Sequence, residues 1–91
     1  MVDIQHGSNR FYVEKDGQEI GEVTYVPQDG NIVVDHTFVS PSMRGQGIAE
    51  QLVDKVVEYA RNEGYKIIPT CSYVVKRMRH VEQYKDVLAS T

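Results

Sequence analysis

The sequence has little of what marks several protein classes: one cysteine, no tryptophan and no long apolar run. A lone cysteine, Cys71, cannot form a disulfide within the chain, which is typical of a reducing compartment. No apolar run approaches the ~18 residues of a transmembrane helix, and the amino terminus lacks the basic and apolar blocks of a signal peptide. We therefore expect a cytoplasmic protein that has no membrane partner.

Basic residues and metal-ligating clusters are also scarce. The chain has 10 lysines and arginines against 13 aspartates and glutamates, a formal net charge of −3. Nucleic-acid-binding domains usually carry a basic surplus, so no nucleic-acid partner is expected, and an adaptor that uses the basic run 76–80 is the weakest alternative. The three histidines and one cysteine lack the spacing of metal ligands, so no metal site is predicted.

A length of 91 residues fits one small domain, residues 1–91, and no repeat or linker divides it. A chain this short buries only about 60% of the surface that its unfolded form exposes. We therefore expect a ligand to bind in a surface cleft rather than in an enclosed cavity.

The first half of the sequence predicts three strands, 10–15, 19–26 and 31–39, which are rich in β-branched and aromatic residues. Asp-Gly pairs separate them, as is typical of tight hairpins. In the third strand, strict alternation places on one face Ile32, Val34, His36 and Phe38, and on the other Val33, Asp35, Thr37 and Val39. Apolar residues on both faces favour a central strand.

The clearest element is an amphipathic helix that begins at Ile48 and ends before Gly64, with apolar residues recurring every three to four positions. A short strand over 65–71, a helix over 73–79 and a weaker short helix over 82–88 follow. This order predicts an α+β fold. We expect a mixed, mostly antiparallel sheet of about four strands, with the long helix on one face and short helices at the C-terminal end.

The loop SPSMRGQG leads from the third strand directly into the long helix. A helix N-terminus offers unpaired backbone N–H groups and a partial positive charge, and glycines let the backbone approach a ligand closely. Such a loop suits a diphosphate. The alternative is an ordinary turn in which Gly45 and Gly47 only relieve backbone strain.

Three separated motifs make the sequence similar to a known family. Arg44-Gly45-Gln46-Gly47-Ile48-Ala49 matches the R-x-x-G-x-A acetyl-CoA signature of the GNAT superfamily of N-acetyltransferases. The chain resembles a compact, single-domain branch that carries a His-Thr pair before this loop, here His36-Thr37. The branch also carries a Pro-x-Cys-x-Tyr segment, here residues 69–73. The similarity extends from about Arg10 to Leu88.

The resemblance implies an acetyl-CoA-dependent acyltransferase that moves an acetyl group to an amine or another small nucleophile. It implies that residues 44–49 hold the diphosphate of coenzyme A, with the pantetheine arm between the strands of His36 and Cys71. Most relatives are longer, and the elements that build their acceptor pocket have no counterpart here. The resemblance therefore leaves the acceptor open, and Phe38 stands where relatives of the short branch often have glutamate.

Two further questions stay open on the sequence alone. Cys71 is a candidate nucleophile because it precedes a predicted helix, whose positive end favours thiolate, or else it is an inert buried thiol. His36 is a candidate general base or a partner that activates Cys71, or else a half-buried strand residue. The alternative to an enzyme is a coenzyme A-binding module or partner-binding scaffold without catalysis. We expect a monomer or weak dimer.

Overall fold

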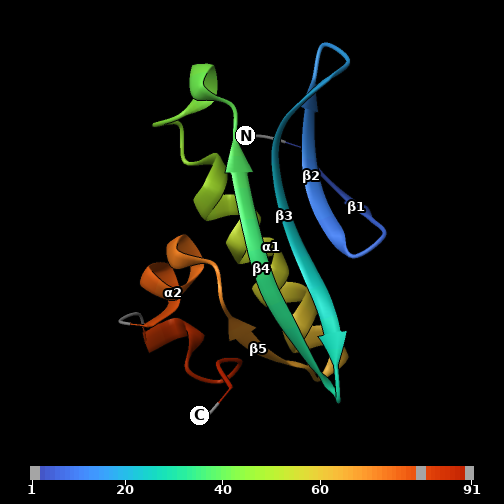
Figure 1. Cartoon of the computed structure of the whole chain (residues 1–91), viewed down its shortest axis with the longest axis vertical. Coiled ribbons are helices and arrows are strands. Elements are labelled where there is room, and N and C mark those ends of the chain that lie inside the picture. The colour runs from blue at the N-terminus through green and yellow to red at the C-terminus, as the bar shows by residue number, and fades with distance from the viewer. Residues whose placement is uncertain (1–2, 80–81, 90–91) are drawn as a thin grey trace.

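The computed structural model describes residues 3–79 and 82–89, and its strands form a five-stranded sheet in the order β1-β2-β3-β4-β5. Helix α1 crosses one face of this sheet, and α2 lies beside β5 (Figure 1). The strands are β1 (Ile4–Gly7), β2 (Arg10–Lys15), β3 (Gln18–Gln28), β4 (Asn31–Val39) and β5 (Lys66–Pro69). The helices are α1 (Ile48–Glu63) and α2 (Ser72–Arg79), with 3-10 turns at Pro41–Met43 and Glu82–Tyr84.

The topology confirms the predicted α+β class with a mixed, mostly antiparallel sheet. Strands β1 to β4 pair antiparallel, β4 and β5 pair parallel, and β4 is central as expected. The sequence analysis missed β1. Its four residues, IQHG, lack an alternating apolar pattern, and it is held by pairing with β2 across a turn in which Asn9 adopts a φ of 57°.

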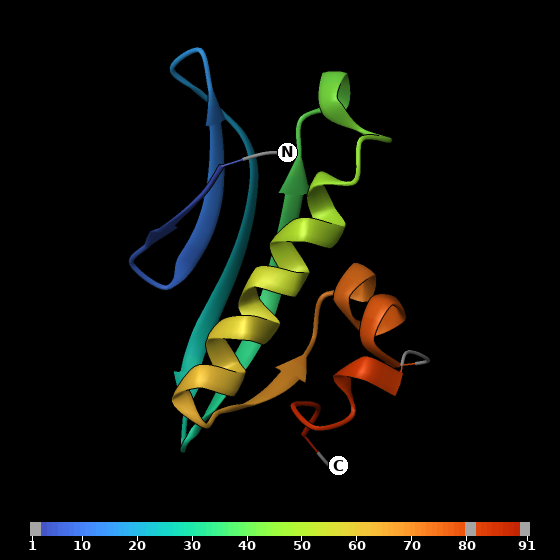
Figure 2. The same ribbon diagram turned by 180° about the vertical axis from the view of Figure 1, so that it is seen from behind.

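The core lies between α1 and the sheet, and Figure 2 shows α1 running diagonally across the sheet with α2 and the C-terminal segment beside it. The helix begins and ends as predicted, with Gly47 and Gly64 in the left-handed conformation at its two ends. One helix face packs on the sheet, and each of its residues is at most 2% exposed: Ile48, Leu52, Val53, Val56, Val57 and Ala60. This packing fixes where the N-terminus of α1 lies.

A β-bulge corrects the predicted faces of β4. Thr24 of β3 lies opposite His36 whereas Tyr25 lies opposite Val34, so Asp35 is an extra residue with no partner in the ladder. An extra residue reverses the alternation of side chains beyond it. The prediction that His36 and Phe38 share the face of Val34 is therefore wrong. Val34 is buried in the core, and both of the others are exposed on the opposite, open face.

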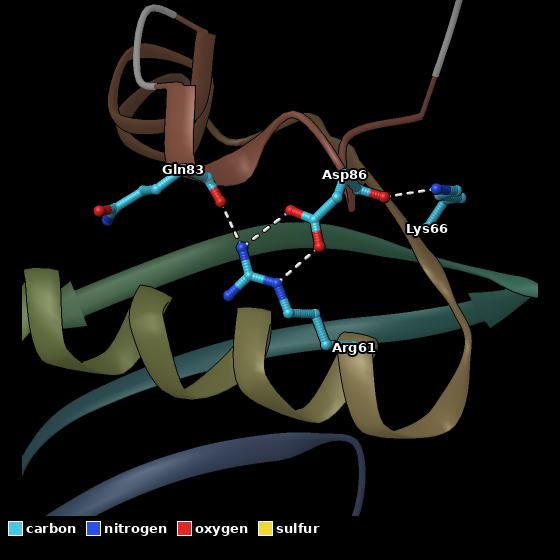
Figure 3. A network of polar contacts seen from close by, with 4 residues as sticks. All are labelled: Arg61, Lys66, Gln83 and Asp86. Carbon is cyan, nitrogen blue, oxygen red and sulfur yellow. Dashed lines mark hydrogen bonds and ion pairs between the residues drawn. The ribbon is translucent and has the colours of Figure 1, made fainter.

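The C-terminal segment covers the outer edge of β5. Ile67 and Leu88 form a parallel bridge, and the predicted helix over 82–88 is wrong beyond Tyr84 because the following residues pair with β5 instead. Arg61 of α1 donates to both carboxylate oxygens of Asp86, at 2.7 and 2.8 Å, and Figure 3 shows this fork with its contact to the carbonyl of Gln83. The segment that ends beside β5 is thereby tied to α1.

Gly21 sets how closely α1 approaches β3, and its replacement gives a first prediction. A Cβ at this position would lie 3.0 Å from Ile48 Cγ2 and 3.2 Å from Leu52 Cδ1. We expect Gly21→Ala to lower the free energy of unfolding by about 1–3 kcal/mol, because the first turns of α1 must move off the sheet. Urea denaturation of the wild type and the variant measures this change in the free energy of unfolding. Val26→Ala, in the same strand at a side chain 50% exposed, is the control and should change stability by less than about 0.5 kcal/mol.

Candidate functional site

Strands β4 and β5 part near the middle of β4. Their parallel ladder ends at the pair Val34 and Pro69, and the backbone N–H groups of Thr70 and Cys71 both donate to the Val34 carbonyl, at 3.0 and 3.3 Å. β4 continues to Val39, and no strand within residues 3–79 and 82–89 pairs with this edge of it beyond Val34. The parting leaves an edge of β4 that no described strand covers, next to the loop that leads into α1.

The loop between β4 and α1 has the backbone geometry of an anion cradle. Gly45 and Gly47 have φ angles of 84° and 76°, a region that other residues adopt only with strain. Gly47 is the N-cap of α1 and has no side chain to bond the first N–H groups, which therefore stay free of a side-chain cap. A hollow of about 170 Å³ lies at this point, lined by Val39, Met43, Arg44, Gly45, Gly47, Ile48, Ala49 and Glu50.

The six residues predicted to bind the diphosphate thus lie together. Arg44, Gly45, Gly47, Ile48 and Ala49 line the hollow, and Gln46, which is exposed, points its amide nitrogen toward Met43 Sδ at 3.9 Å. Backbone N–H groups at a helix N-terminus, with an arginine beside them, can bind a phosphate group through hydrogen bonds and charge. The geometry of the loop therefore suits an anion, and the role of each residue stays a prediction.

Cys71 lies at the start of α2, where it takes the N-cap position: its carbonyl accepts from Val75 N–H at 2.9 Å. The half-buried thiol lies 3.7 Å from Thr37 Oγ1. Burial alone would raise the pKa of Cys71. Hydrogen bonds from the backbone N–H groups of Val74 and Tyr73 and from the Thr37 hydroxyl and backbone favour the thiolate, and the net effect lowers this pKa.

His36 does not share this environment. It neighbours Thr37 in β4, so its side chain lies on the opposite face of the strand, and it is exposed. The hydrogen bond that the Cys71 thiol makes goes to Thr37 rather than to His36. The structure brings Cys71 together with Thr37 and not with His36, which faces the open side of the sheet instead.

Two residues that the sequence analysis did not assign to the site join its two helices. The Tyr73 hydroxyl donates to Glu50 Oε1 at 2.9 Å, which links the first turn of α2 to the first turn of α1. Burial and this hydrogen bond raise the pKa of Tyr73 to about 12. Sequence patterns gave no signal for this contact, because the two helices are separated along the sequence by β5 and come together only in the fold.

The remaining charged residues of α2 are mostly structural or exposed. Arg77 pairs with Asp54 of α1 at 3.6 Å and lies over the Tyr84 ring, whereas Lys76 and Arg79 are exposed. His80, the last residue of the basic run, lies outside the described residues.

Within residues 3–79 and 82–89, no group of three or more metal-ligating side chains converges. None of the helices described there combines the length and apolar character needed to span a bilayer.

The environment of Cys71 predicts a reactive thiol. Alkylation requires the thiolate, so the rate with iodoacetamide should fall as the pH falls through the lowered pKa, with a midpoint below that of free cysteine. Thr37→Val removes the hydroxyl at nearly constant shape and should move this midpoint to higher pH. Denatured protein is the control. A midpoint in the native chain at or above that of the denatured chain would contradict the prediction.

Comparison with known proteins agrees with this geometry. A sequence model of the GCN5-related N-acetyl-transferase family matches residues 10–87. No curated protein sequence matches significantly. Among solved structures, the chain is similar to a GCN5-like candidate N-acetyltransferase from Staphylococcus aureus, with 35% identity and a TM-score of 0.82. That match covers 99% of this chain and 90% of the other.

Longer solved proteins share the same fold. A ribosomal-protein-alanine N-acetyltransferase from Brucella melitensis biovar Abortus is 26% identical with a TM-score of 0.59, and the match covers 90% of this chain and 62% of that one. A GNAT acetyltransferase from Elizabethkingia anophelis, solved with acetyl-CoA bound, is 22% identical with a TM-score of 0.62. That match covers 82% of this chain and 51% of the other. The family match over most of the sequence and the 35% identical solved protein show that this chain belongs to the GCN5-related N-acetyltransferase (GNAT) family.

Proposed function

We propose that this chain is an acetyltransferase that uses acetyl-CoA as the acetyl donor and an amine or another small nucleophile as the acceptor. One observation carries the proposal: a side-chain hydrogen bond joins the first turns of two helices beside the edge of β4 that β5 leaves uncovered. The anion cradle lies at the start of α1, the Cys71 thiol lies at the start of α2, and the contact between Glu50 and Tyr73 joins them. The donor's anionic and reactive ends would thus meet suitable groups in one region.

The residues present fit the donor. The uncapped N–H groups of α1, the glycines at positive φ and Arg44 would hold its diphosphate, with Gln46, Ile48 and Ala49 completing the loop. The free edge of β4 beyond Val34 offers backbone groups to the pantetheine arm. Bound acetyl-CoA would supply an acetyl group activated as a thioester. Two solved proteins with this fold hold acetyl-CoA, which supports this choice of donor.

Cys71 would take the acetyl group first. Its thiolate forms a bond to the acetyl carbonyl carbon while the bond from that carbon to the sulfur of coenzyme A breaks. The acceptor nitrogen then displaces Cys71 Sγ and loses a proton, and the released coenzyme A takes up one proton. The lowered pKa of Cys71 and its hydrogen bond with Thr37 support this role, because both favour the nucleophilic thiolate.

For His36 we propose the role of general base toward the acceptor, working from the open face of the sheet. Its exposure and its place on the face of β4 opposite Thr37 support contact with an incoming molecule rather than with Cys71. His36→Ala should therefore lower the rate of acetyl transfer by about 100-fold or more and leave the alkylation of Cys71 unchanged. An unchanged transfer rate would contradict this role.

Donor binding is tested by titrating the protein with acetyl-CoA and with plain coenzyme A while following backbone amide shifts. We expect the largest changes at residues 44–49 and along β4 beyond Val34, because the diphosphate accepts hydrogen bonds from the loop. Shifts should be small at Gly17 and Gly30, which lie in hairpin turns and serve as internal controls. The absence of any change at Gly45 and Gly47 would overturn the proposed function.

Catalysis is tested by mass spectrometry and by turnover with a panel of amines. Incubation with acetyl-CoA should add one acetyl group to Cys71, and Cys71→Ala should abolish both the adduct and most of the turnover while it still binds coenzyme A. Binding without an adduct and without loss of thioester would instead identify a coenzyme A-binding module. Full turnover by Cys71→Ala would remove the covalent step and leave direct transfer.

A further inference from the structure

The hydrogen bond between Tyr73 and Glu50 is an unexplained feature of the candidate site. The Tyr73 hydroxyl donates to Glu50 Oε1 at 2.9 Å, and the pair is partly buried. Both residues belong to first turns, Glu50 to that of α1 and Tyr73 to that of α2. The contact therefore ties the anion cradle to the helix that carries the Cys71 thiol at its start.

Glu50 occupies the position from which an acidic side chain most readily caps a helix. With Gly47 as the N-cap, Glu50 is the third residue of α1, and in a capping box the side chain at this position accepts from the N–H of the N-cap residue. A Cβ built on Gly47 would lie 3.3 Å from Glu50 Oε2, so the carboxylate is within reach of the loop. Glu50 also lines the hollow. It is an anion of the chain itself at the edge of the cradle.

We propose that Tyr73 is a positioning residue: it holds Glu50 Oε1, so that the carboxylate, which lies beside Gly47, does not bond the N–H groups at the start of α1 and leaves them for the donor's diphosphate. Without the phenol, the carboxylate turns toward Gly47 and caps the helix, and the donor must displace it. The inference rests on the proposed function for the identity of the donor. Its structural half, the movement of Glu50, stands on the contacts alone.

Of the two acidic residues nearest the start of α1, Glu50 is the one that can compete with a diphosphate for the helix N–H groups. Asp54, one turn further along α1, is engaged by the Tyr84 hydroxyl and by Arg77 of α2. Arg44 lines the hollow and adds a positive charge that would attract a diphosphate and a carboxylate alike. A diphosphate and Glu50 therefore compete for the same N–H groups. The Tyr73 hydroxyl restrains Glu50 by a hydrogen bond, and Arg77 of α2 adds an electrostatic attraction.

The structural half is tested without any ligand. In Tyr73→Phe the ring is kept and the donor hydroxyl is lost, so Glu50 should cap the helix and the Gly47 amide proton should shift relative to the wild type. In the double variant Glu50→Ala/Tyr73→Phe this shift should disappear. A Gly47 amide that is the same in Tyr73→Phe as in the wild type, in protein shown to be folded by its spectrum, would overturn the proposal.

The functional half is tested by the affinity of each variant for coenzyme A and for pantetheine, which lacks the diphosphate. Tyr73→Phe should weaken coenzyme A binding about fivefold, the effect expected of one hydrogen bond, and leave pantetheine binding unchanged. Glu50→Ala/Tyr73→Phe should restore the affinity, which a merely structural role for Tyr73 would not do. Equal loss for both ligands, or no restoration, would overturn the proposal.

A matched control separates local competition from net charge. Glu58→Ala/Tyr73→Phe removes one carboxylate from the same helix, at a side chain 63% exposed. Glu58 lies eight residues beyond Glu50, about 12 Å along the helix and further than the ~8 Å screening length at physiological salt. The double variant Glu58→Ala/Tyr73→Phe should therefore not restore the affinity for coenzyme A. Should wild-type protein fail to bind coenzyme A, the proposed function fails, and the Gly47 amide still decides whether Tyr73 restrains Glu50.

Discussion

The candidate site depends on one backbone acceptor, the carbonyl of Val34. This carbonyl accepts hydrogen bonds from the backbone N–H groups of both Thr70 and Cys71, at the last pair of the β4–β5 ladder. Because one carbonyl takes both donors, the chain leaves β4 at this point and α2 begins at Ser72. β4 itself runs on to Val39 and into the glycine loop. The parting therefore places the thiol against one end of an open strand edge and the anion cradle at the other.

The two helix N-termini then determine the electrostatics of the region. In a protein with a net charge of −3, an anionic donor gains little from overall charge, so the positive potential has to be local. Free N–H groups at the start of α1 supply it for a phosphate, and those at the start of α2 supply it for the sulfur of Cys71. Gly21 contributes indirectly, because the lack of a side chain lets the first turn of α1 lie close to β3.

Much of the fold follows from local patterns, and the exceptions share one cause. The 3.6-residue periodicity predicted α1 to within a residue, and the Asp-Gly pairs predicted the hairpins. The bulge at Asp35 could not be predicted, because an extra residue is defined only by the pairing of β4 with β3. Strand β1 likewise exists only through its pairing with the neighbouring β2, and Leu88 pairs with β5, a partner distant in sequence. In the site, the glycine loop was predictable for the same local reasons that α1 was, whereas the contact between Tyr73 and Glu50 was not.

The bulge also bears on how donor and acceptor would be kept apart. With strict alternation, His36 would have shared the core face of Val34, and Thr37 would have faced away from Cys71. The extra residue Asp35 turns Thr37 toward the thiol and His36 toward the open face, and the Thr24 hydroxyl holds the Asp35 carboxylate at 2.6 Å. In the proposed reaction, nucleophile and base then work from opposite faces of one strand. Such an arrangement requires the acceptor nitrogen, after it gives its proton to His36, to reach the acetyl group on Cys71 past the edge of β4 that β5 leaves uncovered, beyond the end of the ladder at Val34.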